Sequence, residues 1–279
     1  MTLWYAFCDA LPLEILHWDF MKNAFLAILL MAPLFGLTST MVVSGKMSFF
    51  SDALGHAAFT GIAIGSICGI ANSTLSAVIF SIAFALIFSY VRSRSNHTAD
   101  TLIGVFSSTA VALGIFIATL DGGSFTKYNR YLIGDILSIT ASEIGLLAIL
   151  LVFVVIFWVL YSNRLTLTAI YPQLASSRGI SIGTLQCLFT VAISLTVTLC
   201  ISWVGLLILN SLLILPAAAA RNIAKNLRQY HFFSVLLALI AGLSGLCISY
   251  FLGTSAGAVI SLILALEFII CFSMRKVRS

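Results

Sequence analysis

Residues 47–69 read MSFFSDALGHAAFTGIAIGSICG and combine the two features that decide the fold, a close-packing face and a pair of ionisable side chains. Asp52 and His56 are four residues apart, so a helix places both on one face, one turn apart. A carboxylate and an imidazole are both ligands for Zn²⁺ and Mn²⁺. A neighbouring face carries a small residue at every fourth position: Ala53, Ala57, Gly61, Gly65 and Gly69. Because small residues at this spacing let membrane helices approach closely, the stretch suggests a metal path through a membrane.

The composition of the chain supports a membrane location. Of its 279 residues, 61% are hydrophobic and only 8% are charged, and the mean hydropathy is +1.14. Soluble globular proteins carry about 25% charged residues. No polar block is long enough to form a second, soluble domain. The net charge of +5 is therefore attributed to membrane topology rather than to nucleic-acid binding.

The apolar runs predict an all-α, polytopic membrane protein with eight or nine transmembrane helices. These helices form one transmembrane domain over residues 20–274, which follows an interfacial segment at residues 1–19 and precedes a cytoplasmic basic tail at residues 275–279. Two tryptophans mark the first segment as interfacial, because tryptophan favours the headgroup layer. The expected spans are residues 20–43, 52–71, 75–91, 101–120, 142–161, 182–203, 205–220, 231–250 and 255–274.

The basic residues of the loops predict the orientation of these spans. With nine crossings, one side of the membrane collects eleven Lys and Arg residues and the other side collects three. The side richer in Lys and Arg faces the cytoplasm in membrane proteins. The chain is therefore expected in the cell membrane with its C-terminus in the cytoplasm.

Two polar segments interrupt the apolar pattern. Residues 121–141 are too polar to span and too apolar for a plain loop, and they include Gly134 and Asp135. Asp135 is either a turn residue or an acid at the mouth of a path, since irregular backbone at membrane depth must be buried in protein or line a wet cavity. Residues 163–181 are predicted to form a cytoplasmic loop.

The Asp52–His56 pair has a second interpretation. Asp is a favoured N-cap residue, and Asp52 precedes an apolar run, so the pair could cap the helix and form hydrogen bonds within the bundle. Ionisable groups within membrane spans are, however, costly and usually functional. Both interpretations stay open from the residues alone. Glu267, deep in the last span, is assigned a structural role.

Common catalytic motifs are absent from the sequence. The chain has no GxxxxGK[ST] motif, so it does not bind ATP in the P-loop manner. It also lacks the HExxH and GxSxG motifs. The chain is therefore not expected to be an enzyme.

Five segments, in order along most of the chain, carry a resemblance to a known family: MSFFSDALGHAAFTGIAIG at 47–65, DTLIG at 100–104, YLIGDIL at 131–137, PQLASSRGI at 172–180 and VGLLILNSLLILPAAAAR at 204–221. With these segments, the chain resembles the membrane permease subunit of the metal-uptake ABC transporters, which import zinc, manganese or iron. The resemblance implies a dimer of permeases in the lipid bilayer, an ATP-binding subunit on a separate cytoplasmic chain, and an extracytoplasmic metal-binding protein. It implies no nucleic-acid partner.

The resemblance also assigns roles to single residues. The DALxHA motif implies metal-path residues at Asp52 and His56, and the GD motif implies an acid of the translocation pathway at Asp135. The family usually has an Asp before the PxLAxxxG motif and a Pro near the start of the last span, where this chain has Tyr171 and Thr254–Ser255. The PxLAxxxG motif implies that four residues belong to the loop that docks on the ATPase: Pro172, Leu174, Ala175 and Gly179.

We therefore expect the permease subunit of an ATP-driven importer of a divalent transition metal, with zinc or manganese favoured over iron. One Asp and one His from each of two chains would supply two carboxylates and two imidazoles, which suit any of these metals. The metal is transported, and no permanently bound cofactor is expected. A stand-alone ion channel or secondary transporter is the alternative, and a purely structural membrane subunit is a third interpretation.

Overall fold

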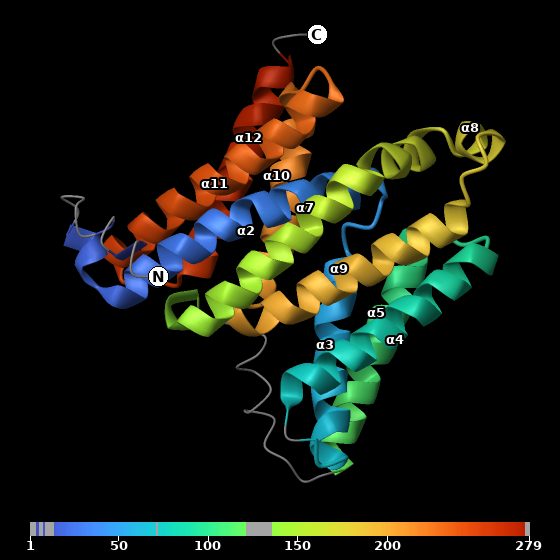
Figure 1. The fold of residues 1–279 in the computed structure, drawn as a ribbon, viewed down its shortest axis with the longest axis horizontal. Helices are drawn as coiled ribbons and strands as arrows, with labels where there is room; N and C mark the ends of the chain where they lie inside the picture. The colour runs from blue at the N-terminus through green and yellow to red at the C-terminus, as the bar shows by residue number, and fades with distance from the viewer. Residues whose placement is uncertain (1–3, 6–7, 9–13, 71, 121–135, 277–279) are drawn as a thin grey trace. The chain divides into compact units, whose positions relative to one another are not determined.

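The computed structural model describes the chain outside residues 1–3, 6–7, 9–13, 71, 121–135 and 277–279 (Figure 1). Every regular element in this described part is helical. Eight of its helices are long and apolar enough to cross a membrane, which confirms the predicted all-α polytopic fold. Helix α3 has the same length as the shortest of these eight, 18 residues, but it holds Asp52 and His56 and is not one of the eight.

Most of the helices coincide with the apolar runs of the sequence. The segment at residues 163–181, predicted as a loop, is mostly helical, because α7 continues to Ile170 and a separate short helix, α8, follows. The elements are η1 (Glu14–His17), α2 (Asp19–Ser44), α3 (Phe50–Ile67), α4 (Ser73–Arg94), α5 (Ala99–Leu120), η2 (Ile136–Ser138), α7 (Ala141–Ile170), α8 (Pro172–Ser177), α9 (Ile182–Val204), α10 (Leu206–Ile223), α11 (Leu227–Leu252) and α12 (Ala256–Lys276).

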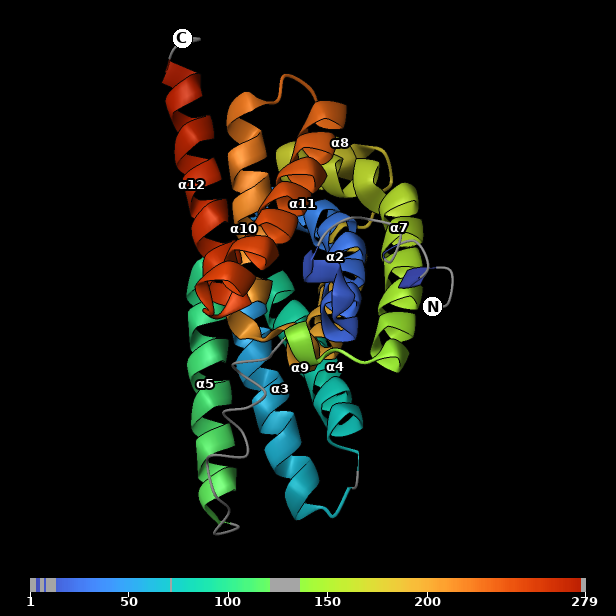
Figure 2. The ribbon, with the colours of Figure 1, turned by 90° about the vertical axis from the view of Figure 1, so that its left-hand side faces the viewer.

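The chain divides into two compact units, which are described separately. Unit 1 comprises Met1–Thr40, Asp135–Trp158 and Trp203–Ser279, and unit 2 comprises Met41–Gly134 and Val159–Ser202. In unit 1, helices α10, α11 and α12 pack against one another, as both views show (Figures 1 and 2).

Helix α2 joins unit 1 through a close contact with α11. A Cβ atom on Gly36 would lie 2.7 Å from the Cα of Val235, so only glycine permits this approach. The hydroxyl of Ser234 donates a hydrogen bond of 2.7 Å to the carbonyl oxygen of Gly36. Interhelical packing of small residues and hydrogen bonds of this kind are what hold membrane helices together.

His231 is buried in the same unit, although its basic sequence context suggests a solvated residue. Its side chain is only 8% exposed, and its Nδ1 atom lies 2.7 Å from the Oγ1 atom of Thr40. The ring also packs edge-on against Trp158, with the ring centroids 5.0 Å apart. Tertiary packing with α2 and α7 thus overrides the local polarity.

In unit 2, helix α3 lies beside both α4 and α5 (Figure 2). A Cβ atom on Gly61 would lie 2.8 Å from the Cβ of Phe80 and 2.9 Å from the Cα of Ala77, both in α4. On the α5 side, a Cβ atom on Gly114 would lie 2.7 Å from the Oγ1 of Thr60. Helix α3 therefore approaches the backbone of α4, and it packs side-chain atoms against the glycine of α5.

Gly69 does not belong to the packed face on which the sequence placed it. Helix α3 ends at Ile67, and Gly69 lies beyond it with φ of +70° and no other atom near the position of a Cβ. The amide of Ile70 donates to the carbonyl of Gly65, and the amide of Gly69 donates to that of Ser66. These two bonds form a Schellman motif, in which glycine takes the left-handed conformation that terminates the helix.

The α3–α4 contact predicts that Gly61→Ala destabilises the protein. The added methyl group would meet the backbone of α4, so the helices would have to separate and lose their mutual packing. We expect a loss of about 1–3 kcal/mol, seen as a lower midpoint of thermal unfolding in detergent.

Gly104→Ala in α5 is the matched control, because a Cβ atom there would meet nothing within 4 Å. We expect this variant to unfold at or above the temperature of the parent protein, since alanine favours a helix over glycine. Equal destabilisation by both substitutions would contradict the close contact at Gly61.

Candidate functional site

Helix α3 has one stripe that the described part of the chain covers only in part. From residue 50 to residue 65, every residue is buried except Asp52, His56 and Ile64, which are only partly covered. Asp52 and His56, one turn apart, lie on one face of the helix, and Ile64 lies two further turns along, rotated from His56 by about 80°. Packing against α4 and α5 therefore encloses the helix elsewhere and exposes the face that carries the acid and the imidazole.

The two ionisable side chains on this stripe lie close together. The Oδ2 atom of Asp52 is 3.5 Å from the Nε2 atom of His56, and the side chains are 43% and 28% exposed. Two ligands of a tetrahedral zinc ion, each about 2.1 Å from the metal, are separated by about 3.4 Å. The two atoms thus already have nearly the spacing that a shared ion requires.

The structure does not support a role for Asp52 as the N-cap of α3. The N-cap residue is Phe49, which makes no side-chain capping hydrogen bond, and Asp52 occupies the third position of the helix. A carboxylate in the first turn still interacts favourably with the helix dipole. That interaction leaves its oxygen atoms on the partly exposed stripe, next to His56.

The small residues of α3 lie on faces other than this stripe. Ala53 and Ala57 are fully buried. Gly61 and Gly65 both pack against α4, where Gly65 faces Ser76. Gly61 and Gly65 therefore bring α4 close without covering the acid–imidazole pair.

Thr60 extends the spacing of the pair by one more turn, and it was not among the residues predicted from the sequence. It is fully buried, and its Oγ1 atom lies 2.6 Å from the carbonyl oxygen of Ala110 in α5 and 3.0 Å from that of His56. The sequence feature that could have identified Thr60 is a hydroxyl side chain four residues after His56. Its hydrogen bond to Ala110 fixes the rotation of α3 relative to α5, and hence the direction in which His56 points.

Asp135 and Gly134 lie outside the described residues, so the predicted acid of the translocation pathway stays a prediction. Among the described residues, no three His, Cys, Asp or Glu side chains come together. Within the described residues, the candidate metal-ligating group is therefore limited to the two side chains of Asp52 and His56.

The residues of the predicted docking segment form a short, exposed helix. Pro172 is the first residue of α8, where its missing amide costs no hydrogen bond. Leu174 is 44% exposed, whereas Ala175 is completely buried and anchors the helix. After Arg178, Gly179 ends α8 with φ of +72° and a Schellman motif, which accounts for the glycine at this position.

The family model of the ABC 3 transport family matches residues 17–275. The chain belongs to this family. It is 28% identical over 248 residues to the high-affinity zinc uptake system membrane protein ZnuB of Haemophilus influenzae, covering 89% of this chain and 93% of that protein. It is also 29% identical over 259 residues to the manganese import system permease protein ScaB of Streptococcus gordonii, with coverage of 91% and 90%.

A solved structure shows the same fold as this member of the ABC 3 transport family. It is PsaBC from Streptococcus pneumoniae in complex with Fab, which superposes with a TM-score of 0.79 at 26% identity and covers 98% of this chain and 95% of that chain. The family match establishes an ABC transporter permease, and the sequence resemblance is thereby confirmed.

The hydrogen bond of Thr60 predicts that Thr60→Val lowers stability. Valine has nearly the same shape but cannot donate to Ala110, so the loss is the interhelical bond itself. Such bonds contribute about 0.6 kcal/mol in membrane proteins. The measurement is the midpoint of thermal unfolding in detergent.

Thr109→Val in α5 is the control, because that exposed hydroxyl bonds only within its own helix, to the carbonyl of Val105. We expect no measurable change for it. If Thr60→Val and Thr109→Val had the same midpoint of thermal unfolding, the Thr60 hydrogen bond would not stabilise the α3–α5 contact.

Proposed function

We propose that this chain is the permease subunit of an ATP-driven importer that moves a divalent transition metal into the cytoplasm. One observation carries the proposal. The acid and the imidazole of α3 lie at ligand spacing on the only stripe of that helix, between residues 50 and 65, that the described chain leaves uncovered. A buried structural pair would be enclosed by α4 and α5, as the other faces of α3 are.

A second copy of the permease completes the site in this proposal. Two chains meeting near Asp52 and His56 would supply two carboxylates and two imidazoles. Four such ligands form a complete coordination sphere for zinc, and they also suit manganese or iron. Because a transported ion must leave again, a site shared between two subunits is more suitable than a closed cage.

The proposed metal is zinc or manganese. ZnuB is named for zinc uptake and ScaB for manganese import, and both align with nearly the whole of this chain. A carboxylate and an imidazole are ligand types that zinc and manganese both accept.

The charge distribution and the family match support the proposed direction of transport and the proposed partners. The excess of Lys and Arg on one side assigns the C-terminus and α8 to the cytoplasm. We infer that α8 docks on an ATP-binding subunit there, through exposed residues around Leu174, and that Asp135 helps to attract the ion outside. An extracytoplasmic metal-binding protein would deliver the ion to that side.

We expect metal uptake to fall at least about tenfold in Asp52→Asn and in His56→Gln. Both changes keep the size and hydrogen bonding of the side chain but weaken metal ligation. Mutation of residues that only orient a metal ligand already lowers metal affinity or activity about 10- to 100-fold. The measurement is uptake of radioactive zinc and manganese by cells that express equal amounts of each variant. A smaller loss is expected for Asp135→Asn.

Asp100→Asn is the matched control, because Asp100 is an exposed acid in the first turn of α5 and does not belong to the acid–imidazole pair of α3. It should transport normally. Parental uptake in the Asp52→Asn, His56→Gln double variant would overturn the metal path. Uptake that continued without ATP would instead favour a channel or a secondary transporter.

The docking proposal predicts that Leu174→Glu lowers the affinity of the ATP-binding subunit for the permease at least about tenfold, which is about 1.4 kcal/mol. The substitution places a charge on the exposed, apolar part of α8. Binding of the purified partner to the permease in detergent gives the measurement. Substitution of Gly179 is less informative, because its positive φ strains any other residue.

Asn163→Asp is the control for added negative charge, since Asn163 is exposed on α7 outside α8. Normal association is expected. An equal effect of the two variants would point to general electrostatics and count against docking through α8.

A further inference from the structure

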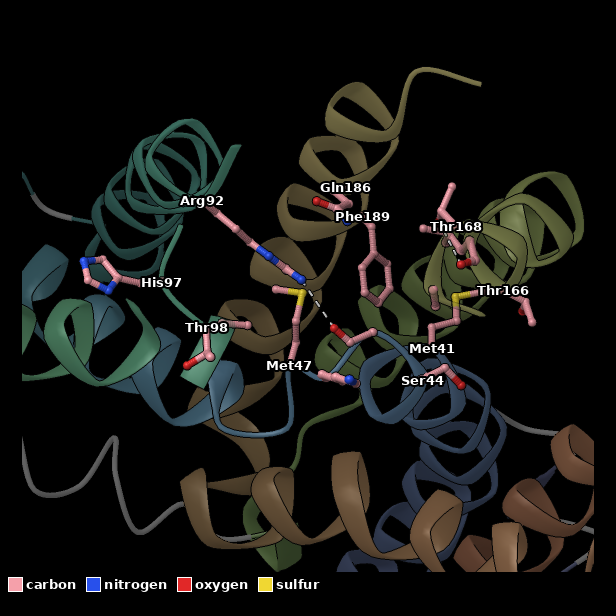
Figure 3. Close-up of a pocket in the computed structure, with 15 residues that line it drawn as sticks. Met41, Ser44, Met47, Arg92, His97, Thr98, Thr166, Thr168, Gln186 and Phe189 are labelled. Atoms are coloured by element: carbon pink, nitrogen blue, oxygen red, sulfur yellow. Dashed lines mark hydrogen bonds between the residues drawn. The ribbon is translucent and has the colours of Figure 1, made fainter. Parts of the chain in front are cut away.

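A cavity of about 420 Å³ lies in unit 2, and the proposed metal path does not use it. It is walled by the turn between α2 and α3, the end of α4, the start of α5, the end of α7 and the start of α9 (Figure 3). The ionisable side chains that line it are Lys46, Arg92 and His97. No carboxylate of the described residues lines the cavity, and Asp100, the acid closest in sequence, is exposed. The cavity is therefore electropositive.

Neutral hydrogen-bonding groups accompany these bases. Thr98 directly precedes α5, a helix of 22 residues that begins at Ala99, and the positive end of the helix dipole lies there. The remaining polar lining consists of hydroxyl and amide side chains from three further elements: Ser44, Thr166, Thr168 and Gln186. Basic groups, hydroxyl groups and a helix N-terminus around one space are typical of a site for a phosphate group.

Arg92 is the most informative residue of this cavity. Its Nη2 atom donates to the carbonyl oxygen of Gly45 over 3.4 Å, the contact drawn in Figure 3. Its Nη1 atom is buried and has no hydrogen-bond partner among the described residues. Because an unpaired buried donor is costly, an acceptor is expected beside it. A guanidinium group matches the paired oxygens of a phosphate.

Lys46 provides a second observation, independent of Arg92. It is the only non-glycine residue of the described chain with positive φ, at 54°. The amide of Met47 donates to Val42, and the amide of Lys46 donates to Val43, so α2 ends in a Schellman motif with a lysine at the position that favours glycine. Strained backbone of this kind tends to occur at functional sites.

We propose that this cavity binds a phosphate group through Arg92 and Lys46. The group comes either from the headgroup of an anionic phospholipid or from free phosphate. Basic pockets between membrane helices are known to accept lipid headgroups. A bound phosphate would hold together the turn that leads into α3 and the end of α7 that leads into α8.

The test measures the thermal unfolding midpoint of the full-length chain in detergent. Inorganic phosphate and short-chain phosphatidylglycerol are the two probes, with sodium chloride of equal ionic strength and short-chain phosphatidylcholine as their references. We expect at least one probe to stabilise the parent protein beyond its reference. The probe's apparent affinity should weaken at least about tenfold in Arg92→Gln and in Lys46→Gly.

Lys46→Gly keeps the test valid if Arg92→Gln fails to fold, because glycine relieves the positive φ and should maintain stability without a probe. Arg94→Gln is the control, since Arg94 is exposed, stacks on Tyr90 and does not line the cavity. It should respond as the parent does.

The pattern of responses decides both the site and the source. Stabilisation by phosphatidylglycerol alone identifies a lipid headgroup, and stabilisation by inorganic phosphate identifies the free ion. The proposal is wrong if neither probe exceeds its reference, or if Arg92→Gln and Lys46→Gly respond as strongly as Arg94→Gln. Metal transport does not enter this measurement, so the result is independent of the proposed function.

Discussion

The contact of α3 with α4 and α5 is the constraint on which the candidate site depends. In a bilayer, apolar surface alone does not drive helices together, because lipid is as apolar as the side chains. Association must come from close packing and interhelical hydrogen bonds. Gly61 and Gly114 supply the close packing, and Thr60 supplies an interhelical hydrogen bond. Helix α3 can hold an acid and an imidazole within the membrane domain because its other faces are fixed so firmly.

The sequence was sufficient for the fold class and for the pairing of Asp52 with His56. Hydropathy locates long helices because lipid demands about 20 apolar residues in succession. Helical periodicity then places residues four apart on one face. The close approach at Gly61 was also foreseeable, because a small residue at every fourth position of a membrane helix is typical of a tightly packed helix pair.

Three features could not be predicted because they depend on groups far apart in the sequence or on local backbone geometry. Gly69 extends the small-residue pattern but terminates α3, since the Schellman bonds act only once the helix has formed. Residues 163–170 are too polar for a span, yet α7 continues through them outside the apolar run. His231 is buried through Thr40, which lies 191 residues away.

The continuity of α7 has a mechanical consequence. At 1.5 Å per residue, its 30 residues form a rod of about 45 Å, which exceeds the hydrocarbon core of a bilayer by about 15 Å. Helices bend sharply only at identifiable breaks, and α7 contains neither proline nor an irregular turn. If α8 docks on an ATP-binding subunit, as proposed, α7 is the uninterrupted helix through which a movement of α8 would reach the membrane-spanning part of the chain.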